Sequence, residues 1–118
     1  MQAKMALYCA GILANKKAGF INFATNITKN CDCIDNPEKP LLPDVGILAS
    51  LDPVAIDTAS IDLINQKAGE VATACPYGES RLFRGKDIFR EVWPEIDYTI
   101  QFKESEKLGV GSRAYKIL

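Results

Sequence analysis

Hydrophobic side chains recur at helical spacing in two stretches of the chain. Apolar residues lie three and four positions apart over residues 3–17, which predicts an amphipathic helix with its apolar stripe on the core. Residues 53–67 carry a wider apolar arc, and Asp52 and Pro53 are a favourable N-cap and first helical residue. We expect this second helix to be buried and to end before Gly69. The pattern predicts two main helices.

Shorter stretches alternate or run apolar in the manner of strands. Residues 20–27 alternate β-branched and aromatic side chains with Asn and Ala, and residues 45–51 are nearly all apolar, as in a strand covered on both faces. Residues 96–102 also favour a strand, although a helix running into the charged residues 103–107 competes for them. Residues 114–118 are the last expected strand. The prediction is an α/β domain with a small mixed sheet flanked by the two main helices.

The chain is long enough for one domain and has little net charge. With 118 residues and a net charge of −1, it should form a single domain over residues 1–118 with a folded accessible surface of roughly 6,300 Å². This charge gives no electrostatic drive toward nucleic acid or anionic membranes, so neither is an expected partner. No apolar stretch reaches the length that spans a bilayer, and no signal-peptide pattern is evident, so we expect a cytoplasmic protein.

Acidic residues around the start of the second helix form one candidate site. The chain has no histidine, so acid–base chemistry falls to carboxylates, Lys, Tyr or Cys. Asp57 falls inside the apolar arc of the helix, where a carboxylate needs a partner or a raised pKa. With Asp44, Ser50 and Asp52 it would line a pocket for a polar ligand, with Asp57 as the candidate catalytic acid or base. The alternative is structural: Asp52 caps the helix, and Asp57 accepts hydrogen bonds from the backbone of a neighbouring loop.

A second candidate site lies in the proline-rich segment 28–44, whose length is unusual for a connection within one domain. It contains Cys31, Asp32 and Cys33, and a local turn could direct both thiols to one soft metal ion or cluster, joined by Cys75 and an Asp, with Asp57 as the alternative to Cys75. Asp32 also counts among the residues of the expected ligand pocket. The alternative is a turn with structural cysteines, because the usual C-x-x-C spacing is absent.

These motifs, together with others along the chain, carry a family resemblance that covers essentially all of it. The residues concerned are Asn26–Thr28, Cys31–Cys33, Asp44–Ser50, Asp52–Asp57, Leu108–Gly111 and Tyr115. They resemble the C-terminal portion of the uncharacterized iron-sulfur center proteins, the domain of unknown function 362 family. The resemblance implies a longer architecture, in which a ferredoxin-like segment with closely spaced cysteines carries the cluster; that segment is absent from these residues.

Three functions follow as hypotheses. In the first, the chain is a domain of an iron-sulfur-associated redox protein of the electron-transfer type. Its site would form where the Cys31–Cys33 loop meets the start of the helix at Pro53, and would hold an iron-sulfur cluster, another soft metal or none. Its partners would be a redox protein or the missing N-terminal part of the family architecture, and exposed surface would favour a homo-oligomer. The alternatives are a non-catalytic interaction or oligomerisation module and an enzyme that uses Asp57 as acid or base.

Overall fold

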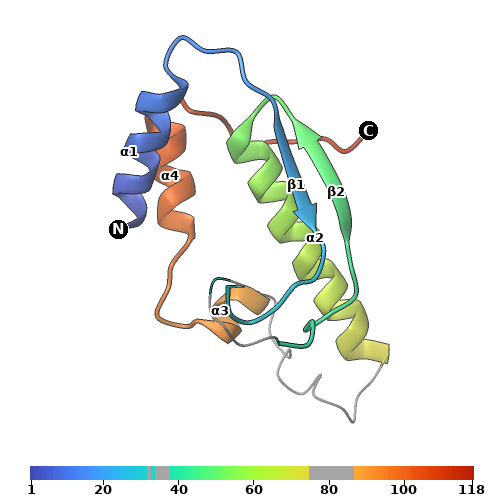
Figure 1. Ribbon diagram of the computed structural model, residues 1–118. Helices are drawn as coiled ribbons and strands as arrows, with labels where there is room; N and C mark the ends of the chain where they lie inside the picture. The colour runs from blue at the N-terminus through green and yellow to red at the C-terminus, as the bar shows by residue number, and fades with distance from the viewer. Residues whose placement is uncertain (32, 34–37, 75–86) are drawn as a thin grey trace.

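Helices and a strand pair alternate along the chain in the computed structural model (Figure 1), which describes residues 1–31, 33, 38–74 and 87–118. This composition of helices and strands confirms the predicted α/β class. The elements in chain order are α1 (Gln2–Leu13), β1 (Phe20–Ala24), β2 (Gly46–Ser50), α2 (Pro53–Ala74), α3 (Ile88–Val92) and α4 (Thr99–Lys107).

The sheet is an antiparallel pair of strands with α2 against one face (Figure 1). Phe20 lies opposite Ser50, and Ala24 lies opposite Gly46. Because β2 runs back along β1 and leads directly into α2, the start of α2 lies at one end of the sheet and the loop between the strands lies at the other. We expected a mixed sheet with a further strand at residues 114–118. In the described part of the chain the sheet is only this pair, and residues 114–118 form no regular element.

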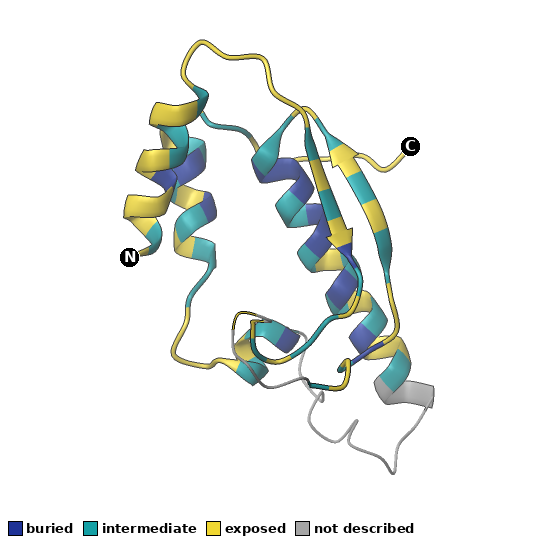
Figure 2. Ribbon diagram, viewed as in Figure 1, coloured by how far each residue is buried: buried dark blue, intermediate teal, exposed yellow. Residues whose placement is uncertain are grey.

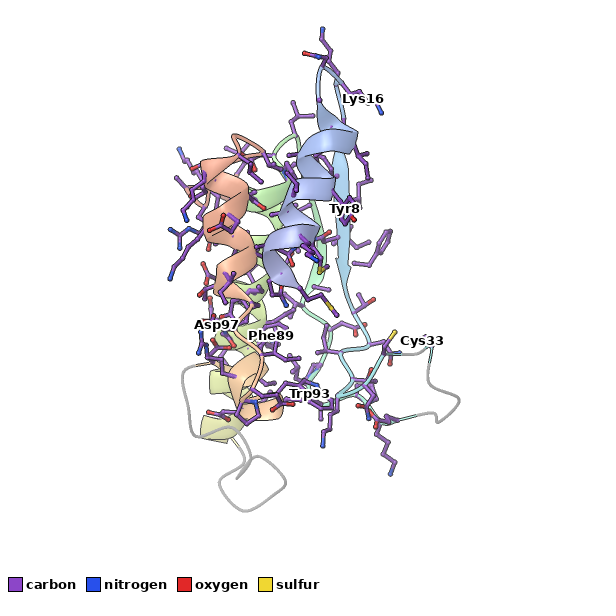
Figure 3. All side chains as sticks on the ribbon, turned by 90° about the vertical axis from the view of Figure 1, so that its left-hand side faces the viewer. Tyr8, Lys16, Cys33, Phe89, Trp93 and Asp97 are labelled. Carbon is purple, nitrogen blue, oxygen red and sulfur yellow. The ribbon has the colours of Figure 1, made fainter. Side chains whose placement is uncertain are left out.

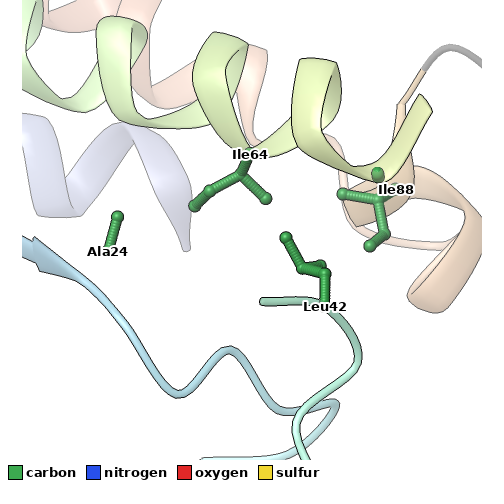
Figure 4. Packing of buried hydrophobic residues seen from close by; sticks show 5 residues of the cluster. Ala24, Leu42, Ile64 and Ile88 are labelled. Carbon is green, nitrogen blue, oxygen red and sulfur yellow. The ribbon is translucent and has the colours of Figure 1, made fainter. Parts of the chain in front are cut away.

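The main hydrophobic cluster lies at the loop end of the sheet, where the segment between the strands folds back onto α2 and α3 (Figure 4). Backbone hydrogen bonds hold that segment in place, from Leu41 N to Ile27 O at 2.7 Å and from Val45 N to Ala24 O at 2.9 Å. The buried members of the cluster are Ala24, Leu42, Ile64, Ala68 and Ile88.

The first helix packs against α4 rather than against the sheet (Figure 1). Its apolar stripe, which we expected on the core, is largely exposed, and Figure 2 shows burial concentrated on α2 instead. Cys9 is half-buried, and Ala6 is the buried residue of the helix. The predicted end at residue 17 was also wrong, because Asn15 adopts a left-handed φ of 58° that ends the helix at Leu13.

Two later elements also differ from the prediction. The second helix continues past Gly69 to Ala74, since a glycine inside a helix costs only about 1 kcal/mol. Residues 99–107 form a helix rather than a strand, because this conformation buries Phe102 and Ser105, three positions apart, on one side. None of the helices in the described part of the chain combines the length and apolarity needed to cross a membrane.

The molecule is more extended than a chain of this size usually is. It measures 50 × 32 × 25 Å, with a radius of gyration of 15.4 Å where roughly 13.5 Å is typical. Its accessible surface is 8546 Å², well above the roughly 6,300 Å² expected from the mass. Much of the additional surface is apolar, because large hydrophobic side chains are exposed on α1 and on both strands.

Candidate functional site

Asp52 begins α2 and also holds the C-terminal segment. Its Oδ1 accepts hydrogen bonds from Val54 N at 2.8 Å and Ala55 N at 2.9 Å, which confirms the predicted N-cap. Its Oδ2 accepts a hydrogen bond from Ser112 N at 2.9 Å. Ser50 supports the same turn, because its Oγ accepts a hydrogen bond from Asp52 N at 3.0 Å. Both predicted pocket residues therefore serve the junction between β2, α2 and the C-terminal segment.

Gly111 belongs to this junction, although the sequence indicated it only as part of the motif Leu108–Gly111 and assigned it no role. A Cβ atom at Gly111 would lie 2.1 Å from Asp52 Oδ1, so only glycine lets the C-terminal segment approach the capping carboxylate. The available signal was the Gly109-Val110-Gly111 turn, which indicated a change of direction without identifying the partner.

Asp44 lies at the other end of the sheet from Asp52. Its Oδ1 accepts a hydrogen bond from Asn26 N at 2.8 Å, next to a left-handed φ of 50° at Asn26. The carboxylate thus stabilises the turn that follows β1. Since all of β2 separates the two acids, the structure does not bring Asp44 into one pocket with Ser50 and Asp52.

Cys31 and Cys33 are exposed in the loop between the strands. Cys33 N donates a hydrogen bond to Cys31 Sγ at 3.4 Å, so a local turn brings the two residues together. Trp93, just after α3, anchors the same loop: its Nε1 donates to Lys29 O at 3.2 Å, and Lys29 Nζ lies 5.7 Å from the centre of its ring. In the described residues no group of three or more Cys, Asp or Glu side chains could hold a metal ion. Asp32 and Cys75 lie outside the described residues.

The expected meeting of the cysteine loop with the start of α2 was wrong. In Figure 3, Cys33 lies toward the Trp93 end of the molecule, whereas Lys16, which precedes β1, lies at the other end. The physical reason is the strand direction: in an antiparallel pair, the loop after β1 and the connection after β2 leave from opposite ends of the sheet. The loop meets α3, and the start of α2 at Pro53 meets the C-terminal segment.

Asp57 is half-buried and paired, as its place in the apolar arc requires. Its Oδ1 accepts a hydrogen bond from Asn22 Nδ2 at 2.8 Å, and the same amide donates to Ser60 Oγ at 3.0 Å. Ser60 in turn donates to Ile56 O at 2.8 Å. The partner is thus a side-chain amide on β1, where we expected loop backbone. The alternation of residues 20–27, which turns Asn22 away from the face of Ile21, was the signal for it.

Clefts of ≈ 370 and ≈ 420 Å³ are present, and such volumes suit small ligands. The cleft of ≈ 420 Å³ opens beside the cluster of Asp57, Asn22 and Ser60. It lies between β1 and α2 on one side and α3 and α4 on the other. Of its lining residues the most informative are Asn22, Asp57, Ser60, Phe89, Tyr98 and Phe102.

Tyr98 forms the far wall of the cleft. Its hydroxyl donates to Asp87 Oδ2 at 2.6 Å, and its ring meets Phe89 and Phe102 edge-on at centroid distances of 5.8 and 6.0 Å. Burial, together with the hydrogen bond to the Asp87 carboxylate and its negative charge, raises the pKa of Tyr98 well above its ordinary value. Asp87 also caps α3 by accepting from Phe89 N and Arg90 N.

Comparison with known proteins yields one family. The model of the domain of unknown function DUF362 matches residues 1–62, which are 62 of the 118 residues and extend from α1 into α2. No curated protein and no solved structure matches the chain. The matched part includes both exposed cysteines and Asp57, while the family description specifies neither an activity nor a cofactor. Since the match covers more than half of the sequence, the chain belongs to the DUF362 family.

Proposed function

We propose that this chain is an assembly module whose outer sheet face is covered by a second copy of the same chain. The outer sheet face is the side of the strand pair turned away from α2, and consists of Ile21, Phe23, Ile47 and Ala49. The observation that carries the proposal is the exposure of its three large side chains, which are 63%, 66% and 64% accessible for Ile21, Phe23 and Ile47.

The residues of the outer sheet face form one continuous apolar surface. Phe23 lies directly opposite Ile47, and Ile21 lies opposite Ala49, so the four side chains are cross-strand neighbours. The other face of the same strands packs on α2. Helix α2 therefore supplies one covering layer, whereas a contiguous exposed apolar patch on the opposite face is typical of a surface that another molecule covers. A second layer on that face would remove these side chains from water.

A second copy fits this surface because the surface is uncharged. In a two-fold dimer both partners contribute the same patch, so the patch must be complementary to itself, as a continuous apolar surface is. None of the four residues is charged, and the net charge of −1 produces little overall repulsion. Two such faces can pack as aligned sheets with interdigitating side chains. The excess of surface over the mass-based expectation supports the same conclusion.

The test is the molar mass in solution, measured by light scattering and sedimentation over a wide concentration range. We expect the wild type to be a dimer and the double variant Phe23→Thr/Ile47→Thr to be a folded monomer, since threonine retains strand propensity while removing apolar area. Ile12→Thr is the matched control, because Ile12 is 63% accessible on α1. A monomeric wild type, or a double variant that dimerises as well as the control, would contradict the proposal.

A second candidate function is metal or iron-sulfur binding by the cysteine loop, as part of a redox protein. The hydrogen bond from Cys33 N to Cys31 Sγ favours it, because N–H donors to sulfur accompany metal-bound thiolates and tune cluster potentials. Two thiolates supply half of a four-ligand site. The others would come from Asp32, Cys75 or a docked redox partner.

This second proposal is tested by metal and acid-labile sulfide content and by the absorption spectrum of protein purified without oxygen. We expect bound metal that is lost in Cys31→Ser/Cys33→Ser and retained in Cys9→Ser, whose thiol is half-buried on α1. Metal-free protein, or equal metal in both variants, would remove the ligand role from this loop. Neither result depends on whether the outer sheet face dimerises.

A further inference from the structure

The cleft beside Asp57 has the dimensions of a small-molecule site. Its volume is ≈ 420 Å³, within the range of roughly 300–1,000 Å³ typical of ligand pockets. Apolar side chains form most of its wall, and Asp57, Asn22 and Ser60 place one polar cluster on the α2 side. This combination of an apolar wall and a few convergent polar groups is characteristic of sites that orient a ligand.

The hydrogen-bond donors of the polar cluster are all engaged, whereas two of its acceptor atoms receive no hydrogen bond from the described residues. Both hydrogens of the Asn22 amide are engaged, one by Asp57 Oδ1 and one by Ser60 Oγ. The Ser60 hydroxyl hydrogen is engaged by Ile56 O. Among the described residues, nothing donates to Asp57 Oδ2 or to Asn22 Oδ1. A ligand that matches the cluster must therefore bring hydrogen-bond donors.

Among ligands that bring hydrogen-bond donors, the negative charge of the cleft favours a cation. Asp57 is the one ionisable carboxylate among the described lining residues, and none of them is Lys or Arg. Arg90, which is not among the lining residues, lies over the Tyr98 ring at 6.0 Å and is paired with Asp97. Within the described part of the chain, the half-buried Asp57 carboxylate accepts a neutral hydrogen bond from Asn22 and no cation, which leaves it available to an ammonium group.

The aromatic wall fits the remainder of such a ligand. The Tyr98 ring lies between Phe89 and Phe102 with its hydroxyl held by Asp87, so the rings present a fixed apolar surface. Aromatic faces attract cations and pack against apolar groups. We propose that this cleft binds a small organic cation, a primary amine with an apolar body, whose ammonium group donates to Asp57 and Asn22. The polar contacts of the proposed site are separate from the outer sheet face, because Asp57 and Asn22 lie on the inner side of the strand pair, although Ile21 and Phe23 also border the cleft.

The test is a titration followed by amide NMR, with a series of protonated primary amines that includes butylamine and phenethylamine. Phenylacetate, which has the same ring and the opposite charge, is the matched probe. We expect the amines to bind with a dissociation constant of about 1 mM, as befits ligands of this size, and to shift the side-chain amide signals of Asn22 and Gln101.

Two variants in α2 distinguish binding at the Asp57 site from a general effect of removing one negative charge from the helix. Asp57→Asn should weaken amine binding at least about tenfold, whereas Asp62→Asn should leave it unchanged. Asp62 is the matched control, since it is an exposed acid of the same helix whose Oδ2 accepts from Tyr115 Oη at 2.8 Å. Absence of binding by every amine, equal binding of phenylacetate, or equal weakening in both variants would overturn the proposal.

Discussion

Single carboxylates connect separate segments of this chain. Asp52 caps α2 with one oxygen and holds Ser112 with the other, although 60 residues separate the two positions. Asp87 likewise caps α3 and accepts the hydroxyl hydrogen of Tyr98. In each case a helix cap that local sequence specifies also makes a tertiary contact, so its loss should affect two regions at once.

Gly111→Ala should destabilise the protein by about 1–3 kcal/mol, because the added methyl group overlaps Asp52 Oδ1 and must displace either the cap or the C-terminal segment. Urea denaturation measures the effect. Gly11→Ala is the matched control: its Cβ would meet nothing within 4 Å in α1, and it should stabilise by about 0.5–1 kcal/mol. Equal effects of the two substitutions would show that the close approach at Gly111 is unimportant.

Tyr98 should make the protein less stable at alkaline pH. The pKa of Tyr98 is raised in the folded state. The contribution of Tyr98 to the free energy of unfolding is therefore fully present below the ordinary pKa of about 10. It is lost as the pH rises above that value, because the unfolded chain then releases the proton while the folded chain retains it. We expect the denaturation midpoint of the wild type to fall more between about pH 9 and pH 11 than that of Tyr98→Phe. Parallel pH profiles for the two proteins would contradict this assignment.

At the scale of elements, packing decided where helices end and which stretches become helical. A glycine predicted the end of α2, but the helix continues for another turn toward Ala74. Residues 96–102 alternate and residues 103–107 are charged, so both a strand and a helix were compatible with the pattern, and the helix over residues 99–107 prevails because it buries Phe102 and Ser105 together. Cross-strand pairing was unavailable to them, since the described sheet contains only β1 and β2.

Gly69→Ala tests the extent of α2. Within a continuous helix, alanine should stabilise the protein by about 0.5–1 kcal/mol, and a Cβ at Gly69 would meet nothing within 4 Å. A glycine that ended the helix in the left-handed conformation would give the opposite sign, because alanine is strained there. Thermal and urea denaturation of the variant therefore distinguish the two helix boundaries.

At the scale of the whole molecule, a small core supports a large surface. The buried cluster around Leu42 and Ile64 lies at one end of an elongated molecule, while α1 and the outer sheet face expose large apolar side chains. The segment between the strands supplies Leu42 to that cluster and carries the exposed cysteines at the same time. Its stability and the geometry of the cysteine turn are therefore linked.

Leu42→Ala should destabilise the whole protein by about 2–5 kcal/mol, because it leaves a cavity between Ile64 and Ile88. Leu7→Ala, at an exposed position on α1, should change stability by no more than about 0.5 kcal/mol. Urea denaturation compares the two variants. A small effect at Leu42 would mean that the loop is not anchored on the core as the structure places it.

The elements with strong local signals were predictable from the sequence. The Asp52 cap, both strands of the pair and the buried character of α2 follow from residue types and their spacing. The need of Asp57 for a partner was also predictable, since it lies inside an apolar arc. The identity of that partner, Asn22, was not predictable, because hydrogen bonds across 35 residues depend on which face of β1 packs on α2.

The sequence by itself determined the α/β class, the strand-turn-helix unit from Gly46 onward and the family to which the chain belongs. These depend on local propensity and on periodicity, which neighbouring residues specify. Only the tertiary structure decided that the cysteine loop lies away from the start of α2, that Gly111 meets Asp52, and that Asp57 borders a cleft with Tyr98. The direction in which two strands pair carries no local signal, yet it determines which ends of the chain's elements meet.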